Sequence, residues 1–281
     1  MGYKKRLMTE DNFKILGHRD FKDMNLPPIL YKYRDWNNPD YKRVLTENEV
    51  YLPSPANFKD KFDCKVPIRY DLLKNKDIYN KYLFESKKNN QTFKRQQHRQ
   101  FARDWVKKGL LKDEKRIKDL DDEFFKEFNR NFGVFSLTAI PDNYEMWEKY
   151  SAEHSGFCVG FNTIPLLNLS QYFKGGGVVS YSDELPIIMP FELFEKQHYF
   201  QIYSKLKKFK FEEEFRLRKD NIENRKVKIP TEIYCKIILG AKISNDSKDE
   251  ILKIAKYNFP NVKLLQAVIE NNSVILNKIE I

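Results

Sequence analysis

Short apolar runs, some continuous and some alternating with polar residues, predict a succession of β-strands along the chain. The first two cover 29–34 and 49–55, and prolines precede the former and end the latter. Later runs predict strands at 133–138, 156–161, 176–182, 211–219, 225–230, 234–241 and 262–269. Apolar residues at helical spacing predict helices at 143–152, 189–207 and 245–257. Because the connections follow no regular βαβ alternation, the pattern predicts an α+β fold with a mixed, mainly antiparallel sheet.

Residues 66–130 interrupt this series with a long, charged and largely helical stretch. We interpret it as a basic helical insertion between the early strands and the later ones. The chain contains no internal repeat and no Gly/Ser-rich linker that would separate two domains. Residues 1–281 are therefore expected to form a single domain.

Positive charge is concentrated in part of this insertion. The chain has 51 Lys and Arg against 40 Asp and Glu, a net charge of +11, and residues 85–118 alone hold twelve basic and four acidic side chains. Large apolar residues recur among these cations at roughly helical intervals, namely Phe93, Phe101, Trp105, Leu110 and Leu111. Two interpretations stay open: a solvated outer helix face, or a contact surface for nucleic acid or another polyanion. No sequence signature of a known nucleic-acid-binding fold accompanies the charge.

Several classes of protein are not expected from the sequence. The opening residues MGYKKRLMTEDNF lack the apolar stretch of a secretory signal, and no apolar run is long enough to span a membrane. A cytoplasmic protein without membrane contact is therefore expected. The three cysteines and four histidines are widely spaced, which predicts neither a disulfide framework nor a metal site.

The predicted strand at 211–219, FEEEFRLRK, carries the strongest candidate chemistry. Strand alternation places Glu212, Glu214, Arg216 and Arg218 on one face. One interpretation is a ladder of compensating ion pairs, each contributing under about 1 kcal/mol if exposed. The other is a catalytic pair, because two carboxylates in a sheltered cleft repel each other and the pKa of one rises, which suits acid–base chemistry. Glu212 and Glu214 are therefore the leading catalytic candidates.

Several motifs resemble the uncharacterised bacterial family known as domain of unknown function 2971. The first is the loop at 58–63, FKDKFD, although the family has Asn and Pro where this chain has Lys59 and Lys61. The other matching positions are Met146, Trp147, Tyr150, His154, Gly156, Cys158, Gly160, Phe161, Lys205, Glu212, Glu214 and Arg216. The resemblance runs through most of the chain and implies no particular activity.

The order of an arginine, a serine and a Glu-x-Glu strand also resembles the arrangement in ADP-ribosyltransferases. By order alone the corresponding residues are Arg34, Ser136 and Glu214, with Glu212 near the acceptor. The resemblance implies an NAD cofactor whose phosphates Arg34 would hold and whose nicotinamide ribose Ser136 would orient. Glu214 would then stabilise the positive charge that develops at the anomeric carbon. The aromatic residues that could stack on nicotinamide, or equally belong to the core, are Tyr33, Tyr51 and Trp147.

Four further residues are candidates for binding. His154 follows the helix at 143–152, where it could face a cleft or cap the helix end. Lys205 could neutralise a phosphate or pair with a carboxylate, and Arg216 is a candidate cofactor-binding residue. Asp63 could bond the amides of its own loop or line a site.

Three functions are consistent with the sequence. The first is transfer of ADP-ribose from NAD to a protein or nucleic acid. The second is a nucleic-acid-binding or phosphodiester-cleaving protein of a defence or toxin type, in which residues 85–118 hold the polyanion and the carboxylates bind a divalent ion. The third is a non-catalytic module that senses a small ligand.

Overall fold

An eight-stranded sheet lies at the centre of the computed structural model, which describes residues 26–279. Across the sheet the strands follow the order β12 (Ser273–Lys278), β11 (Lys263–Glu270), β10 (Tyr234–Leu239), β4 (Phe157–Asn162), β1 (Ile29–Arg34), β3 (Gly133–Thr138), β8 (Glu214–Lys219) and β5 (Gly175–Val178). Neighbouring strands are antiparallel except for β10 and β11, which are parallel. The predicted α+β fold with a mixed, mainly antiparallel sheet is therefore confirmed. The opening segment MGYKKRLMTEDNF, from which the absence of a secretory signal is expected, lies outside the described residues.

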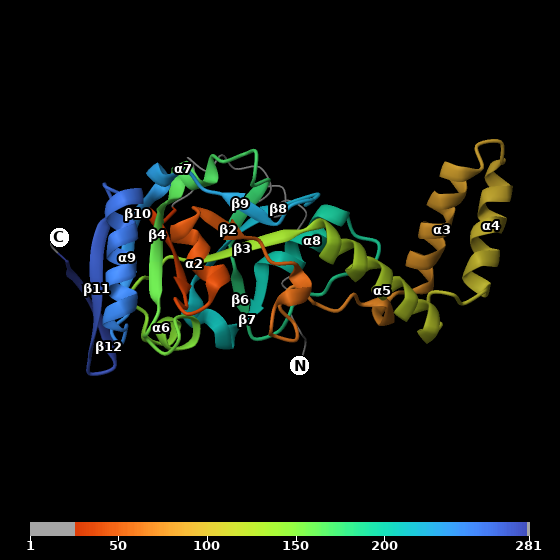
Figure 1. The fold of residues 1–281 in the computed structure, drawn as a ribbon. Helices are drawn as coiled ribbons and strands as arrows, with labels where there is room; N and C mark the ends of the chain where they lie inside the picture. Colours follow the sequence, from red (N-terminus) through yellow and green to blue (C-terminus); the bar gives the residue numbers. More distant parts are fainter. Residues whose placement is uncertain (1–25, 280–281) are drawn as a thin grey trace.

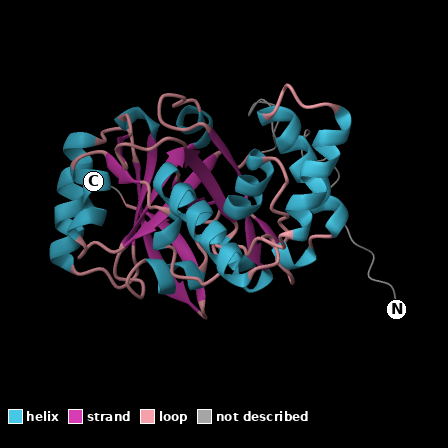
Figure 2. Ribbon diagram, turned by 90° about the vertical axis from the view of Figure 1, so that its right-hand side faces the viewer, coloured by secondary structure: helices cyan, strands magenta, loops and turns pink. Residues whose placement is uncertain are grey.

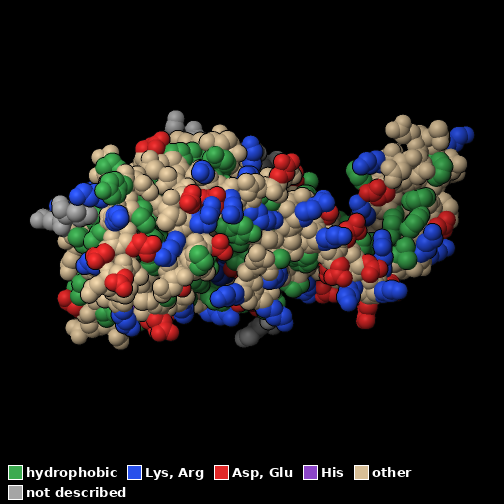
Figure 3. All heavy atoms as spheres, viewed as in Figure 1, with side chains coloured by type: hydrophobic (Ala, Val, Ile, Leu, Met, Phe, Trp, Pro, Cys, Tyr) green, Lys and Arg blue, Asp and Glu red, His purple; other side chains and the backbone are tan. Residues whose placement is uncertain are grey.

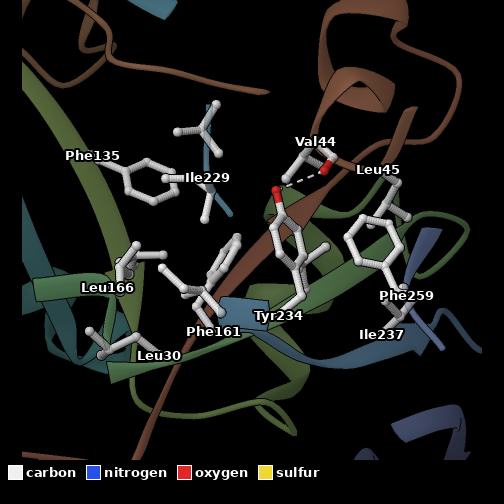
Figure 4. Packing of buried hydrophobic residues seen from close by; sticks show 14 of the residues in the cluster. Leu30, Val44, Leu45, Phe135, Phe161, Leu166, Ile229, Tyr234, Ile237 and Phe259 are labelled. Atoms are coloured by element: carbon white, nitrogen blue, oxygen red, sulfur yellow. Dashed lines mark hydrogen bonds between the residues drawn. The ribbon is translucent and has the colours of Figure 1, made fainter. Parts of the chain in front are cut away.

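One face of the sheet, which we call the α9 face, holds the largest apolar core. It is covered by α2 (Pro39–Thr46), α7 (Thr163–Leu167) and α9 (Asn245–Asn258), and by a small sheet of β2 (Glu49–Tyr51) and β9 (Lys226–Lys228). Figure 4 shows strand residues such as Phe161 and Ile237 packed against helix residues, with the Tyr234 hydroxyl donating to the Val44 carbonyl at 3.0 Å. Burying each such side chain stabilises the fold by roughly 1.5–3 kcal/mol, which makes this core the main source of stability.

The opposite face, the α6 face, carries polar as well as apolar side chains. It is covered by α6 (Tyr144–Tyr150), α8 (Phe194–Tyr203), the 3-10 helix η4 (Lys207–Glu212), and a parallel pair of β6 (Ser180–Ser182) and β7 (Ser204–Leu206). In Figure 2 the strands lie in the middle of the molecule with helices on both sides. Asn143 begins α6 by accepting a hydrogen bond from the Met146 amide, an N-cap that fixes where the helix starts. The short 3-10 helices η2 (Pro55–Asn57), η3 (Tyr70–Leu72) and η5 (Thr231–Ile233) lie in connecting loops.

Three helices form the stretch that the sequence predicts to be a helical insertion. Two of them, α3 (Asn75–Asn89) and α4 (Arg95–Lys107), pack side by side and project from the rest of the molecule (Figure 1). We call this pair the hairpin. The third, α5 (Glu114–Asn131), leads back to the sheet, where Phe128 and Phe132 join a buried cluster with Val134 of β3. The hairpin is therefore held to the body mainly through the base formed by α5.

Several predicted boundaries are wrong. The strand predicted at 211–219 begins only at Glu214, because Glu212 ends η4 and Glu213 has a left-handed backbone, with φ of 37°. The strand predicted at 176–182 is two strands, β5 and β6, and the one at 49–55 stops at Tyr51. The helix predicted at 189–207 extends only over Phe194–Tyr203, and β7 follows it directly. The other elements that the sequence did not predict are α2, α7, β12 and the 3-10 helices η2, η4 and η5. Within residues 26–279, no helix combines the length and apolar character needed to cross a bilayer.

Candidate functional site

A buried cluster of charged side chains lies on the α6 face and is centred on Lys205 of β7. The Lys205 ammonium lies 3.3 Å from an Asp63 carboxylate oxygen and 3.4 Å from one of Glu214, and it also donates to Glu212. The side chains of all four residues are at most 7% exposed. An ammonium group thus occupies the space between three carboxylates from two distant parts of the chain, the loop at Asp63 and the segment that contains Glu212 and Glu214.

Arg216 of β8 forms the second half of this cluster and is completely buried. Its guanidinium pairs with both oxygens of Asp63 at 2.8 and 3.0 Å, and with both oxygens of Glu214 at 3.0 and 2.8 Å. It also donates to the Ile202 carbonyl at 2.7 Å. Such paired contacts use the planar fork of the guanidinium and fix both carboxylates in orientation.

The electrostatics of the cluster follow from its composition of three acids and two bases. Burial alone raises the pKa of Glu214, but the charges of Arg216 and Lys205 outweigh it and lower that pKa to about 2. Burial instead raises the pKa of Glu212, despite the opposing effect of Lys205. For Lys205 burial favours the neutral amine, yet the surrounding carboxylates raise its pKa above the ordinary value. With both bases charged and all three acids ionised, the net charge of the cluster is −1.

Two tyrosines bound the cluster. The Tyr150 hydroxyl, at the end of α6, donates to Glu212 at 2.6 Å, while the residue as a whole is 44% exposed. The Tyr181 hydroxyl accepts a hydrogen bond from the Glu214 amide at 2.9 Å. Tyr150 therefore extends from the cluster toward solvent, and burial of its hydroxyl beside Glu212 raises the pKa of the phenol.

Backbone strain accompanies the charged side chains. Cys64, next to Asp63, has φ of 58°, and Glu213, between Glu212 and Glu214, has φ of 37°. A residue with a Cβ in the left-handed region costs about 1–2 kcal/mol, so these positions persist only because the surrounding contacts hold them. The left-handed turn at Glu213 is also what lets Glu212 reach the cluster from outside β8.

The predicted site residues are only partly brought together. Glu212, Glu214, Lys205 and Arg216 are in direct contact, and Ser136 lies on the same face, directly opposite Arg216 in the β3–β8 pairing. The prediction that Glu212 shares a strand face with Glu214 by simple alternation is wrong, because Glu212 belongs to η4.

Arg34 lies elsewhere. Alternation along β1 and its register with β4 place Arg34 on the α9 face, opposite Phe157, and its guanidinium lies 4.5 Å from the Tyr41 ring of α2. Burial lowers the pKa of Arg34 to about 10. Lys32, on the same side of β1, donates to the Ser136 carbonyl at 2.5 Å. Arg34 therefore does not share a face of the sheet with Ser136 and Glu214.

The aromatic and histidine candidates are packed against other side chains. Tyr33 and Trp147 are buried with their rings edge to face at 5.0 Å, and the Tyr33 hydroxyl donates to the Ile140 carbonyl. His154 is fully buried, with Nε2 3.1 Å from a Glu148 oxygen, and burial lowers its pKa. Its carbonyl accepts from the Lys242 amide, so His154 links the end of α6 to the loop after β10. Tyr51 is 44% exposed on the small β2–β9 sheet.

Three contributors to the cluster were not proposed as leading site residues from the sequence. Asp63 was a second-tier candidate, and Tyr150 and Tyr181 were not assigned a role. The position of Tyr150 four residues after Met146 in the matching motif was the available signal for it. No local pattern indicates that Asp63 reaches Arg216, because the contact joins distant parts of the chain. Among residues 26–279, no group of three or more His, Cys, Asp or Glu is arranged to hold a metal ion.

A second candidate surface lies on the hairpin. Arg95, Arg99, Arg103 and Lys107 follow one another at intervals of four residues along α4, and all four are exposed. None of them forms an ion pair with another residue of the described chain. The other side of α4 packs on α3, through Ala102 and the contact of Trp105 with Tyr82 at 5.3 Å. We call these four cations the α4 stripe.

Comparison with known proteins finds one similarity, to a family model without an assigned activity. No curated protein and no solved structure matches the chain. One segment, residues 146–217, does match a family model. It contains Tyr150, Lys205, Glu212, Glu214 and Arg216, and it does not include the hairpin. Residues 146–217 match the family model described as Protein of unknown function (DUF2971), which confirms over this segment the resemblance noted in the sequence.

Proposed function

We propose that the protein binds nucleic acid through the hairpin. The observation that carries the proposal is the α4 stripe, four exposed cations without ion-pair partners among the described residues, on a helix that projects from the body. Residues four apart on a helix are separated by about 6 Å along the axis, whereas phosphates of one duplex strand follow at about 3.4 Å. Successive cations of the stripe can therefore meet about every second phosphate.

The charge distribution of the molecule supports the hairpin as the contact. In the buried cluster each base already faces carboxylates, so those charges are compensated within the protein. On the hairpin, Lys87 and Lys88 of α3 add exposed cations to the stripe, and Figure 3 shows Lys and Arg side chains among hydrophobic ones over the projecting part. Uncompensated surface cations release counterions from a polyanion when they bind it, which drives association.

The proposal is tested by fluorescence anisotropy of a labelled oligonucleotide, RNA and DNA, over a series of salt concentrations. The double variant Arg103→Ala/Lys107→Ala is expected to weaken binding and to reduce the slope of log K against log salt by about 0.7 for each cation removed from a single-strand contact. Both residues are exposed and alanine favours helix, so the fold is expected to remain intact.

The matched control removes two exposed lysines from α9, as Lys253→Ala/Lys256→Ala. It lowers the net charge by the same amount, and we expect it to leave the salt slope near that of the wild type. Equal slopes for both double variants, or the absence of salt-dependent binding by the wild type, would contradict the proposal.

A second candidate function is the transfer of ADP-ribose from NAD. The contact of Glu212 and Glu214 with one ammonium, beside Ser136 on the same face, favours it. The position of Arg34 on the α9 face leaves the phosphates without the arginine that the mapping requires, and for that reason we rank this function second. Nicotinamide release from NAD by the wild type and not by a folded Glu214→Gln variant would support it; no release by the wild type would count against it.

A further inference from the structure

A cavity of about 460 Å³ opens near the tip of the hairpin, where α3 ends and α4 begins. It is lined by Leu83 and Lys87 of α3 and by Arg95, His98 and Arg99 of α4. Three of these five residues are Lys or Arg, and no Asp or Glu is among them. The first turn of α4, whose free amides carry partial positive charge, lies at the same place.

His98 is held in position at the wall of this cavity. Its Nδ1 lies 2.9 Å from the Ser86 hydroxyl, and its ring packs at 5.6 Å from the ring of Phe93. Ser86 is fully buried, so this contact fixes the ring against α3. A fixed imidazole next to three cations provides a directed polar contact in addition to charge.

The geometry points to a site for a terminal phosphate of a nucleic-acid strand, an inference that rests on the proposed function. An internal phosphodiester carries one negative charge, whereas a terminal phosphomonoester carries about 1.5 to 2 at neutral pH and offers three acceptor oxygens. Lys87, Arg95 and Arg99 together match the second better than the first. The volume lies within the range of small-ligand pockets, about 300–1,000 Å³, so it also accommodates the nucleotide that bears the phosphate.

The α4 stripe continues from this cavity. Arg95 and Arg99 belong to both, and Arg103 and Lys107 follow along the same helix. A strand whose end is held in the cavity would therefore place its next phosphates along α4. The hairpin would bind a strand from its end inward, not at an arbitrary internal position.

The test compares one RNA oligonucleotide in three forms: with a 5′-phosphate, with a 3′-phosphate, and with hydroxyl groups at both ends. Wild-type protein is expected to bind at least one phosphorylated form about tenfold or more tightly than the hydroxyl form, because the terminal phosphate adds hydrogen bonds to a charged group. Which end is preferred then gives the polarity of the bound strand. A nucleoside monophosphate is expected to displace the phosphorylated form, while inorganic phosphate at the same concentration displaces it less.

Two double variants separate this inference from the proposed function. Lys87→Ala/Arg95→Ala is expected to abolish the preference for a phosphorylated end. Arg103→Ala/Lys107→Ala is expected to lower the affinity for all three forms by the same factor and to keep the preference. Circular dichroism checks that the hairpin stays helical in both. Salt-dependent binding without any preference among the three forms would overturn the terminal-phosphate site and leave nucleic-acid binding intact; no binding of any form would overturn both.

Discussion

Lys205 holds the buried cluster together, because among residues 26–279 it alone pairs with Asp63, Glu212 and Glu214 at once. Removing one partner of a buried ion pair leaves an uncompensated charge and costs about 3–5 kcal/mol. We expect Lys205→Met to lower the free energy of unfolding in urea at pH 7 by this amount.

The control for this prediction lies two residues further along. Lys207 also pairs with a carboxylate, that of Asp183, but the two side chains are 61% and 79% exposed. An exposed pair contributes about 0–1 kcal/mol, so Lys207→Met should change the free energy of unfolding by less than that. Similar effects of the two substitutions would mean that the cluster is not tightly coupled.

His198 gives the stability a dependence on pH. Its ring lies against those of Phe124, Phe128, Phe132 and Phe194, and burial lowers its pKa to about 4 from an ordinary value of 6.5. The unfolded chain therefore binds a proton between pH 6.5 and 4 that the folded chain does not. Stability from this histidine is complete above pH 6.5 and falls by about 3 kcal/mol on acidification to pH 4.

The variant His198→Leu isolates this contribution. We expect its free energy of unfolding, measured in urea at several pH values, to fall less than that of the wild type between pH 6.5 and 4. The difference between the two curves belongs to His198, since the other titrating groups are common to both. Parallel curves would show that the pKa of His198 is the same in the folded and the unfolded protein, which contradicts the prediction.

At the residue scale, the sequence shows which side chains are charged. It does not show which face of the sheet Arg34 occupies or which distant residues Asp63 contacts. Alternation along β8 places Glu214 and Arg216 on one face as predicted, because alternation along a strand is local, but it does not apply to Glu212, which belongs to η4. Arg34 could not be placed relative to Glu214 from residue order, since the face it occupies depends on the register of β1 with β4. Asp63 joins the cluster only through tertiary contacts.

At the scale of elements, the connection from α6 to β4 is the most strained in the described chain. Ala152, Glu153 and His154 are three consecutive residues with positive φ, at 46°, 52° and 71°. Backbone hydrogen bonds from Glu153 to Glu148 and from His154 to Trp147 hold this left-handed turn. It positions Tyr150, at the end of α6, against Glu212.

Glycine at position 153 should relieve part of this strain. The Glu153 side chain is exposed and forms no ion pair with the described residues, so its loss removes little. We expect Glu153→Gly to raise the free energy of unfolding by about 1 kcal/mol, because glycine adopts positive φ without steric cost. In the interior of α9, Lys253→Gly should have the opposite sign and cost about 1 kcal/mol, which thermal denaturation of both variants would show.

Elements with a clear run or period of apolar residues, such as β1, β3, β10 and α9, were predictable from sequence. Elements with few buried residues or very few residues were not predicted. β12 follows a turn of Asn271 and Asn272, both with positive φ, which is typical of a hairpin. The strand before this turn, β11, was predicted from the sequence, but β12 after it was not. β7 spans three residues and depends on pairing with β6 more than on its own composition.

At the scale of the whole molecule, the exposed cations of the hairpin and the apolar core of the body lie in separate regions. The two largest apolar clusters contain no residue of α3 or α4, and the hairpin meets the body at few side chains, such as Lys81 over the Phe191 ring. Replacing residues 75–107 by a short Gly/Ser linker should therefore leave the cooperative thermal transition of the body in place. The same variant should lose salt-dependent nucleic-acid binding, by about tenfold or more if the α4 stripe supplies most phosphate contacts.

The outcome that would contradict this separation is a variant that fails to fold, since it would mean that the hairpin supports the sheet. A matched linker inserted into the intact chain after residue 91, in the turn between α3 and α4, controls for the effect of the linker itself. That variant is expected to keep both the transition and the affinity.

The separation also bears on how the chain reaches its structure. The two helices of the hairpin are neighbours in sequence, and such local pairs form within microseconds to milliseconds. In the sheet, β1 lies between β3 and β4, so its partners are synthesised about a hundred residues after it. These distances along the chain predict an order of folding. The hairpin can form its two helices before β3 and β4, the partners of β1, have been synthesised.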